Sequence, residues 1–142
     1  MSSHAGLLAA LVLGGACATA LAAPESAPHA AACVAALEAQ ETTLAQTVKA
    51  GASVGDELLK VVRSGIAIIG TQYLAGLREA EAREMLKAAQ EDFGTLPPAT
   101  ASERQAGCLR EGEAIFEHAS SLERALITTA AQHRIKRITA RK

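Results

Sequence analysis

The sequence predicts an all-α protein, an antiparallel bundle of three long helices that follows an N-terminal signal peptide. Three observations support this class. Apolar residues recur at gaps of three and four through most of the chain, as they do on one face of a helix. No convincing run alternates β-branched and polar residues, as a strand would. Aromatic residues make up 2% of the chain and Trp is absent, so Ala, Leu, Ile and Val must fill the core of one domain.

The first 22 residues are typical of an export signal. An apolar core precedes Ala20-Leu21-Ala22, a cleavage site of the small-x-small type. We therefore expect cleavage after this site, a short linker at 23–28, and a periplasmic or secreted mature protein of bacterial origin. Two alternatives stay open, namely an uncleaved membrane anchor and a lipoprotein attached through Cys17.

Residues 29–142 are expected to form one helical domain with a basic C-terminal end. The first helix is expected at about 29–50, where a glycine ends it. The second helix, at 53–93, begins with acidic residues that suit a helix N-terminus and ends before a glycine and two prolines. It either continues throughout or breaks near Gly65 or Gly70, and a break would give four helices.

The two halves of this second helix differ in what surrounds the main apolar stripe. In residues 54–77, apolar side chains such as Ile66, Ile69 and Tyr73 lie off the stripe, so two neighbouring helices are expected to bury this half. In residues 78–93, charged residues take the off-stripe positions, so one face should be in water. The first helix is about half as long as the second, so it is expected to cover only the first half of the second helix.

The third helix is expected at about 101–138, after a capping-box pattern at Thr100-x-x-Glu103. It would pair with the second helix as an antiparallel hairpin about 60 Å long. The rear half of this hairpin, residues 78–93 and 101–116, is its less covered part. We expect that surface to bind a protein partner or to mediate self-association.

Two cysteines remain after removal of the signal, Cys33 and Cys108. An even number of cysteines in an exported protein favours a disulfide. Straight helices oppose this bond, because they would hold the two residues roughly 20 Å apart, whereas the Cα atoms of a disulfide lie within about 7 Å. The bond therefore requires the second helix to break. The alternative is two buried or free thiols.

The sequence contains no recognisable catalytic or cofactor motif. It has no C-x-x-C, no H-E-x-x-H and no phosphate-binding loop. A weak metal site can be drawn from His118, Glu111 and Met85, but ordinary surface histidines are the simpler interpretation. We therefore expect a protein that is not an enzyme and that holds no metal or cofactor.

Five of the last nine residues are basic, namely Arg134, Lys136, Arg137, Arg141 and Lys142. Because cations suit a helix C-terminus, a solvated end is one interpretation. The other is contact with an anionic lipid, a polysaccharide or an acidic partner of the cell envelope. Nucleic acid is not expected, because the protein is near neutral and lacks aromatic residues suited to stacking on bases.

The segment from Gln72 to Leu77, QYLAGL, resembles part of small periplasmic immunity proteins that neutralise cell-wall-degrading effectors. The resemblance implies an inhibitory role, although the further cysteines of such proteins are missing here. The leading prediction is an exported, non-enzymatic helical protein that binds another macromolecule or has a structural role. A periplasmic carrier of a small ligand or metal, and an immunity protein, are the alternatives.

Overall fold

The computed structural model describes residues 22–141, and the predicted all-α class is confirmed for this part of the chain, which contains no strand. The helices are α1 (Ala27–Lys49), α2 (Gly55–Leu74), α3 (Glu79–Gly94), α4 (Pro98–His118) and α5 (Ser121–Ala140). None of them has both the length and the apolar content that a membrane crossing needs. The predicted signal peptide up to residue 21, including Cys17, lies outside the described residues, as does Lys142.

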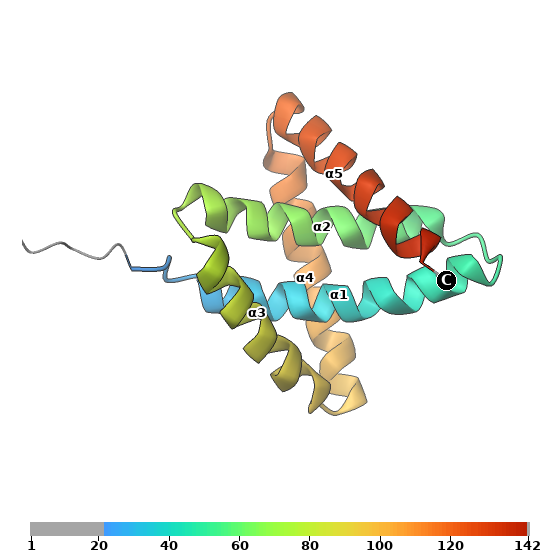
Figure 1. The fold of residues 1–142 in the computed structure, drawn as a ribbon, viewed down its shortest axis with the longest axis horizontal. Helices are drawn as coiled ribbons and strands as arrows, with labels where there is room; N and C mark the ends of the chain where they lie inside the picture. Colours follow the sequence, from blue (N-terminus) through green and yellow to red (C-terminus); the bar gives the residue numbers. More distant parts are fainter. Residues whose placement is uncertain (1–21, 142) are drawn as a thin grey trace, which may run out of the picture.

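The five helices pack in crossed layers rather than as one antiparallel bundle. α1 and α2 lie side by side and antiparallel across the middle of the molecule, and α4 crosses behind both of them (Figure 1). α3 packs diagonally on α1, and α5 packs diagonally on α2. The expected count of three or four helices was therefore wrong, because two of the predicted helices are each broken into two.

The first break lies at Gly76 instead of at Gly65 or Gly70. Gly76 adopts a φ of 100°, a left-handed conformation that favours glycine. The N–H of Leu77 donates to the carbonyl of Gln72 over 2.9 Å, which completes a Schellman motif at the end of α2. Leu77 itself is buried, as the residue at this position of the motif often is. Gly65 and Gly70 remain inside α2.

The second break lies at Ser120, which separates α4 from α5. The Ser120 hydroxyl accepts a hydrogen bond from the Glu123 N–H over 3.2 Å, and the Glu123 carboxylate accepts one from the Ser120 N–H over 2.7 Å. This reciprocal capping box starts a new helix. α4 begins at Pro98, three residues before the expected start, because proline fits the first turn of a helix.

α2 and α4 cross at Ser64 and Gly112 with their backbones nearly in contact. A Cβ placed on Gly112 would lie 2.5 Å from Ser64 Cβ and 2.7 Å from the Ser64 carbonyl oxygen. Ser64 is fully buried, and Gly112 is also buried. The absence of a side chain at Gly112 therefore sets how closely the two helices approach.

The main core forms where α1, α2 and α4 meet. Its largest fully buried apolar side chains are Leu37, Val61 and Ile68. A second apolar cluster joins the start of α2 to the second half of α5 through Ala131, which is fully buried. α5 is thus anchored along its second half.

The expected burial on every side of residues 54–77 is met in part. Ile66 and Ile69 are half-buried, but Tyr73 is 45% exposed and Leu74 is 83% exposed. The chain turns away at the end of α2, and α5 is anchored near the start of α2, so neither neighbour covers this side. The C-terminal half of α2 consequently has an apolar face in water.

Candidate functional site

An apolar groove lies between the C-terminal half of α2, the end of α4 and the first half of α5. Its volume is about 520 Å³. Ala67 is buried in its floor, and Ile66, Ile115 and Ile127 contribute half-buried side chains from the three helices. Packing of α2 against the crossing helix α4 and the anchored helix α5 thus builds the groove from segments far apart in sequence.

The exposed rim of the groove is also apolar. Tyr73 and Leu74 of α2 and Leu126 of α5 line the groove, with Leu74 83% exposed and Leu126 62% exposed. Leu122, one turn before Leu126, is 70% exposed and stands outside the lining. Three of the four large apolar side chains that are exposed within residues 22–141 therefore line this groove, a pattern that marks interaction surfaces.

Glu123 brings a negative charge to the start of α5 in the groove lining. Its hydrogen bonds with the Ser120 side chain and backbone N–H lower the pKa of Glu123 below the ordinary value for a glutamate. The carboxylate is therefore ionised at neutral pH. The groove accordingly combines an apolar trough with one anionic end.

The surface expected from the sequence to bind a partner is more polar than this groove. In α3, which covers most of residues 78–93, Ala82 is the residue that becomes buried, and charged side chains dominate the exposed face. In residues 101–116, Cys108 and Gly112 are buried against other helices. From these two ranges, Ile115 contributes to the groove.

Cys33 of α1 and Cys108 of α4 form a disulfide with Cα atoms 5.2 Å apart. Both residues are buried, at 1% and 5% exposure. The expected conflict with straight helices is resolved by the turn at Gly76, after which α3 and α4 return across α1. A break in the predicted second helix is therefore what brings the two cysteines together.

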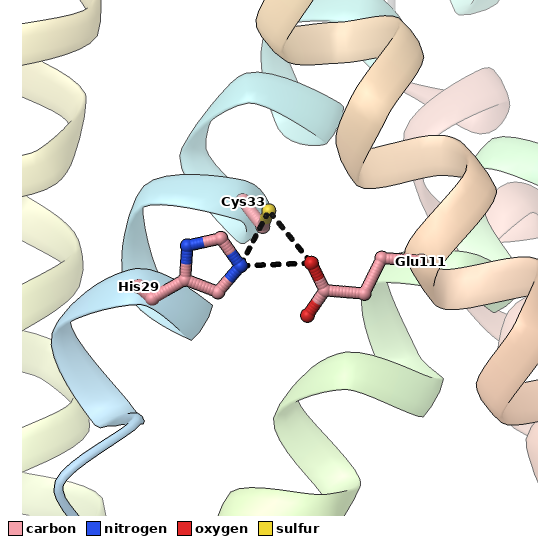
Figure 2. A group of neighbouring side chains, drawn as sticks. All are labelled: His29, Cys33 and Glu111. Carbon is pink, nitrogen blue, oxygen red and sulfur yellow. Dashed lines mark hydrogen bonds and ion pairs between the residues drawn. The ribbon is translucent and has the colours of Figure 1, made fainter.

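Two polar side chains lie beside this disulfide, His29 of α1 and Glu111 of α4. His29 Nε2 is 2.8 Å from Glu111 Oε2 and 3.8 Å from Cys33 Sγ, and the same carboxylate oxygen is 3.9 Å from Cys33 Sγ (Figure 2). The His29 side chain is 65% exposed and that of Glu111 is 40% exposed. A nitrogen, an oxygen and a sulfur thus meet at one point, where the sulfur is buried and the imidazole and carboxylate face solvent.

The histidine that Glu111 contacts is not the one suggested by the sequence. His118 Nδ1 donates a hydrogen bond to the carbonyl of Ala114 over 2.7 Å, on its own helix. Met85 lies on α3 in the lining of a different pocket, which α1, α2 and α3 form. The cluster drawn from His118, Glu111 and Met85 is therefore not assembled.

The basic C-terminal end divides into an internal cation and exposed ones. Arg134 donates hydrogen bonds of 2.9–3.0 Å to Glu41 and of 3.1 Å to Glu38, both on α1. Burial alone would lower the pKa of Arg134, but these two carboxylates outweigh it and raise the pKa above its ordinary value. Lys136, Arg137 and Arg141 are exposed. Arg134 thus fastens α5 to α1, and the other three leave a basic surface.

The groove was not predicted, because Leu74 falls in the half of the second predicted helix that was expected to be buried, and Leu126 falls within a third helix that was expected to run unbroken from about 101 to 138. Their exposure depends on the breaks at Gly76 and Ser120, which change the direction of the chain beside both leucines. Two local signals could have shown this: glycine followed by a large apolar residue, as at a helix end, and the S-x-x-E pattern that starts at Ser120.

No family model matches the chain, and no match is found among curated proteins or solved structures. The candidate binding sites of the described residues are thus the groove, the His29–Glu111 cluster and the basic end. Of these three, the groove exposes the large apolar side chains, whose contact with water is unfavourable. It is consequently the strongest candidate for a binding site.

Proposed function

We propose that the protein is an exported, non-enzymatic helical protein that binds an amphipathic helix of a partner protein in the groove between α2, α4 and α5. The observation that carries the proposal is the exposure of Leu74 and Leu126 on the rim of one apolar groove. Full burial of a leucine side chain is worth about 1.5–3 kcal/mol relative to leaving it in water. A partner that covers both rims would therefore gain a substantial driving force.

The shape of the groove suits a helix. α2 and α5 diverge toward the start of α5 (Figure 1), and the groove runs between them beside the end of α4. Residues with a small side chain or none line the groove, so a helix backbone can approach closely. These residues are Ala67, Gly70, Ala119 and Ala130. Helix-in-groove recognition uses apolar anchors at positions i, i+3 or i+4 and i+7 of the bound helix.

A macromolecular ligand fits the exposed rim better than a small molecule does. The volume of about 520 Å³ falls within the range of small-molecule pockets. Such pockets, however, bury most of the surface of their ligand, whereas Leu74 and Leu126 project into water around this one. A helix laid along the groove would cover these side chains as well as the floor.

Charge favours a partner over a second copy of this chain. Glu123 brings a carboxylate to the groove, so a lysine or arginine beside the apolar stripe of the bound helix would complement it. A twofold contact between two copies uses the same patch twice and would bring both Glu123 carboxylates into one interface. We therefore infer that the groove binds a helix of a different protein, and that this helix has basic residues beside its apolar stripe.

Export is supported by the signal-like pattern of the first 22 residues and by the disulfide between Cys33 and Cys108. Disulfides persist in oxidising compartments such as the bacterial periplasm and the extracellular space. A partner is accordingly sought among proteins of the envelope or outside the cell.

The proposal is tested by selecting helices from a displayed library of amphipathic peptides with varied apolar stripes and flanking charges. The purified oxidised protein serves as bait, and the selected peptides are afterwards measured on its Leu126→Glu variant. Leu122→Glu is the matched control, because Leu122 lies one turn away on the same helix, is also exposed and does not line the groove. Circular dichroism checks that both variants keep the helical content of the parent.

Peptides with a basic flank are expected to bind the parent and the Leu122→Glu control with similar affinity and to lose at least about tenfold on Leu126→Glu, because a charge placed in an apolar contact must be desolvated. Peptides that bind both variants equally would contradict the assignment of the groove. Sedimentation of the parent as a dimer that Leu126→Glu converts to a monomer would assign the groove to a second copy instead.

A further inference from the structure

Three potential metal ligands, His29, Cys33 and Glu111, converge where α1 crosses α4, and their ligand atoms lie within 4.8 Å of one another. Cys108 is a fourth potential ligand and is joined to Cys33 as a disulfide. His29 and Glu111 contact each other beside Cys33 (Figure 2). His29 and Cys33 are four residues apart on α1, and Cys108 and Glu111 are three apart on α4, so each pair shares one face of its helix. Two helices therefore bring an imidazole, a carboxylate and one sulfur together, and the second sulfur is bonded to the first.

We propose that two-electron reduction of the Cys33–Cys108 disulfide turns this cluster into a tetrahedral Zn²⁺ site with His29, Cys33, Cys108 and Glu111 as ligands. In the oxidised protein both sulfurs are bonded to each other and do not serve as thiolate ligands. Reduction supplies the two thiolates that such a site needs. The site is distinct from the apolar groove and does not depend on the function proposed for it.

The distances in the oxidised protein are already close to those of a bound ion. Zn²⁺ holds sulfur at about 2.3 Å and nitrogen or oxygen at about 2.0 Å, so neighbouring ligand atoms in a tetrahedron lie about 3.3–3.8 Å apart. Cys33 Sγ lies 3.8 Å from His29 Nε2 and 3.9 Å from Glu111 Oε2, and these two atoms lie 2.8 Å from each other. Small side-chain rotations suffice to reach the tetrahedral arrangement for these three atoms.

The helix crossing holds the fourth ligand nearby. The Cα atoms of Cys33 and Cys108 are 5.2 Å apart, so rotation of the Cys108 side chain brings its thiolate toward an ion that Cys33 binds. Gly112 follows Glu111 directly and packs α4 tightly on Ser64 of α2. This contact is independent of the disulfide and keeps α4 in place when the disulfide opens.

The burial pattern gives the ion an open side and a closed side. The cysteines are buried at 1% and 5% exposure, whereas the side chains of His29 and Glu111 are 65% and 40% exposed. An ion can therefore enter from solvent past His29 and Glu111 and meet the thiolates at the bottom. Two thiolates with one imidazole favour Zn²⁺ over Mg²⁺ or Ca²⁺, which prefer oxygen ligands.

The chemistry balances with a dithiol as the reductant. The dithiol gives two electrons and two protons, breaks the S–S bond and leaves as its own cyclic disulfide, while Cys33 and Cys108 become thiols. Binding of Zn²⁺ then releases two protons, one from each thiol. The proton that His29 Nε2 shares with Glu111 moves through solvent to Nδ1, which frees both Nε2 and the carboxylate for the metal.

The experiment uses the full mature chain, reduced with a dithiol that is removed under nitrogen before Co²⁺ is added as a spectroscopic probe. The reduced protein is expected to bind one Co²⁺ and to show thiolate-to-metal charge-transfer bands and the intense visible bands of tetrahedral cobalt. Added Zn²⁺ is expected to displace the Co²⁺, so that both sets of bands disappear. The oxidised protein and a Cys33→Ser/Cys108→Ser variant are expected to show neither band. Reduced protein without these bands would overturn the proposal.

Single variants identify the other two ligands. Reduced His29→Ala and Glu111→Gln are each expected to bind Co²⁺ at least about tenfold more weakly than the parent. His118→Ala is the matched control, because His118 lies on α4 but bonds to the carbonyl of Ala114, and its affinity is expected to be unchanged. Equal affinities for all three variants would show that the cysteines bind the metal without His29 and Glu111, contrary to the proposal.

Circular dichroism covers the case in which reduction loosens the fold. If the reduced chain loses helicity, addition of Zn²⁺ is expected to restore it, because metal binding then supplies folding free energy. A reduced chain that stays unfolded at saturating Zn²⁺ would count against the site in the same way as a missing cobalt spectrum.

Discussion

Gly112 of α4 packs directly against Ser64 of α2, where a Cβ on the glycine would lie 2.5 Å from Ser64 Cβ and 2.8 Å from its Cα. This contact fixes how closely the two helices approach. Just before it on α4 lies Glu111, beside the disulfide, and after it comes Ile115 in the apolar groove. One close helix crossing therefore positions both of the sites proposed for this protein.

Substitution of Gly112 by alanine is expected to destabilise the fold. The added methyl group must push α4 away from a fully buried backbone, and overpacking of this kind typically costs about 1–3 kcal/mol. Urea unfolding followed by circular dichroism measures the change. Gly107→Ala on the same helix is the control, because its Cβ would meet the end of the Arg110 side chain at 3.9 Å and Ala favours the helix. Equal loss in both variants would contradict the close crossing.

Loss of the Cys33–Cys108 disulfide is expected to lower the free energy of unfolding by about 2–5 kcal/mol. The bond closes a loop with a sequence separation of 75 residues, which restricts the unfolded chain strongly. Urea unfolding of the Cys33→Ser/Cys108→Ser variant, compared with the oxidised parent, measures the effect. Labelling of free thiols in the unfolded parent should find neither cysteine reactive until a reductant is added, and labelling without reductant would show that the bond is absent.

Arg134→Met is expected to destabilise the protein by about 1–3 kcal/mol, the usual scale for hydrogen bonds to charged groups. The guanidinium bonds to Glu41 and Glu38, and the Glu41 side chain is 9% exposed, so removal of the cation leaves a buried carboxylate without its partner. Arg137→Met is the control, since Arg137 is exposed on the same helix. Thermal unfolding compares the two variants, and equal melting temperatures would argue against the fastening of α5 to α1.

Glu113 makes stability depend on pH in the acidic range. Burial alone would raise the pKa of Glu113, but hydrogen bonds and ion pairs with Lys60 at 2.8 Å and Arg63 at 3.0 Å outweigh it and hold the pKa below its ordinary value of 4.5. A carboxylate with a lowered pKa in the folded state stabilises the protein above its unfolded pKa and loses this effect as pH falls through the folded value.

The Glu113→Gln variant tests this dependence. At pH 6–7 the parent is expected to be more stable than the variant, and the difference should shrink as the pH falls from about 4.5 downward. Urea unfolding over this pH range gives the comparison. A difference that stays constant with pH would mean that the charge of Glu113 does not contribute to stability.

The sequence was sufficient to predict the class of the fold and the need for a break, but not where the chain turns. Apolar residues at helical spacing run straight through Gly76 and Ser120, so periodicity alone joins helices that local capping separates. Cys33 and Cys108 indicated that the second predicted helix must break, because straight helices would hold the two residues too far apart for a disulfide. A helix end was not predicted at Gly76, although this glycine precedes a leucine that can be buried behind a helix end.

The candidate sites depended on those turns and could not be predicted without them. Leu74 and Leu126 are apolar and lie on helices, so the pattern assigns them to the core until the path of the chain leaves them uncovered. His29 and Glu111 are 82 residues apart, and their contact follows from the crossing of α1 and α4. Arg134 was predicted as one of several surface cations. Its contact with the buried Glu41 arises from the packing of α5 on α1, which the sequence pattern does not show.

The groove is tested most directly by methyl NMR spectra of the oxidised protein titrated with a selected amphipathic helix. The methyl signals of Ile66, Ile115, Ile127 and Leu126 are expected to shift with one common dissociation constant, while those of the buried core residue Leu37 stay in place. Shifts confined to residues 78–93 and to the first part of α4 would contradict it, because they would place the binding surface on the polar side of the molecule.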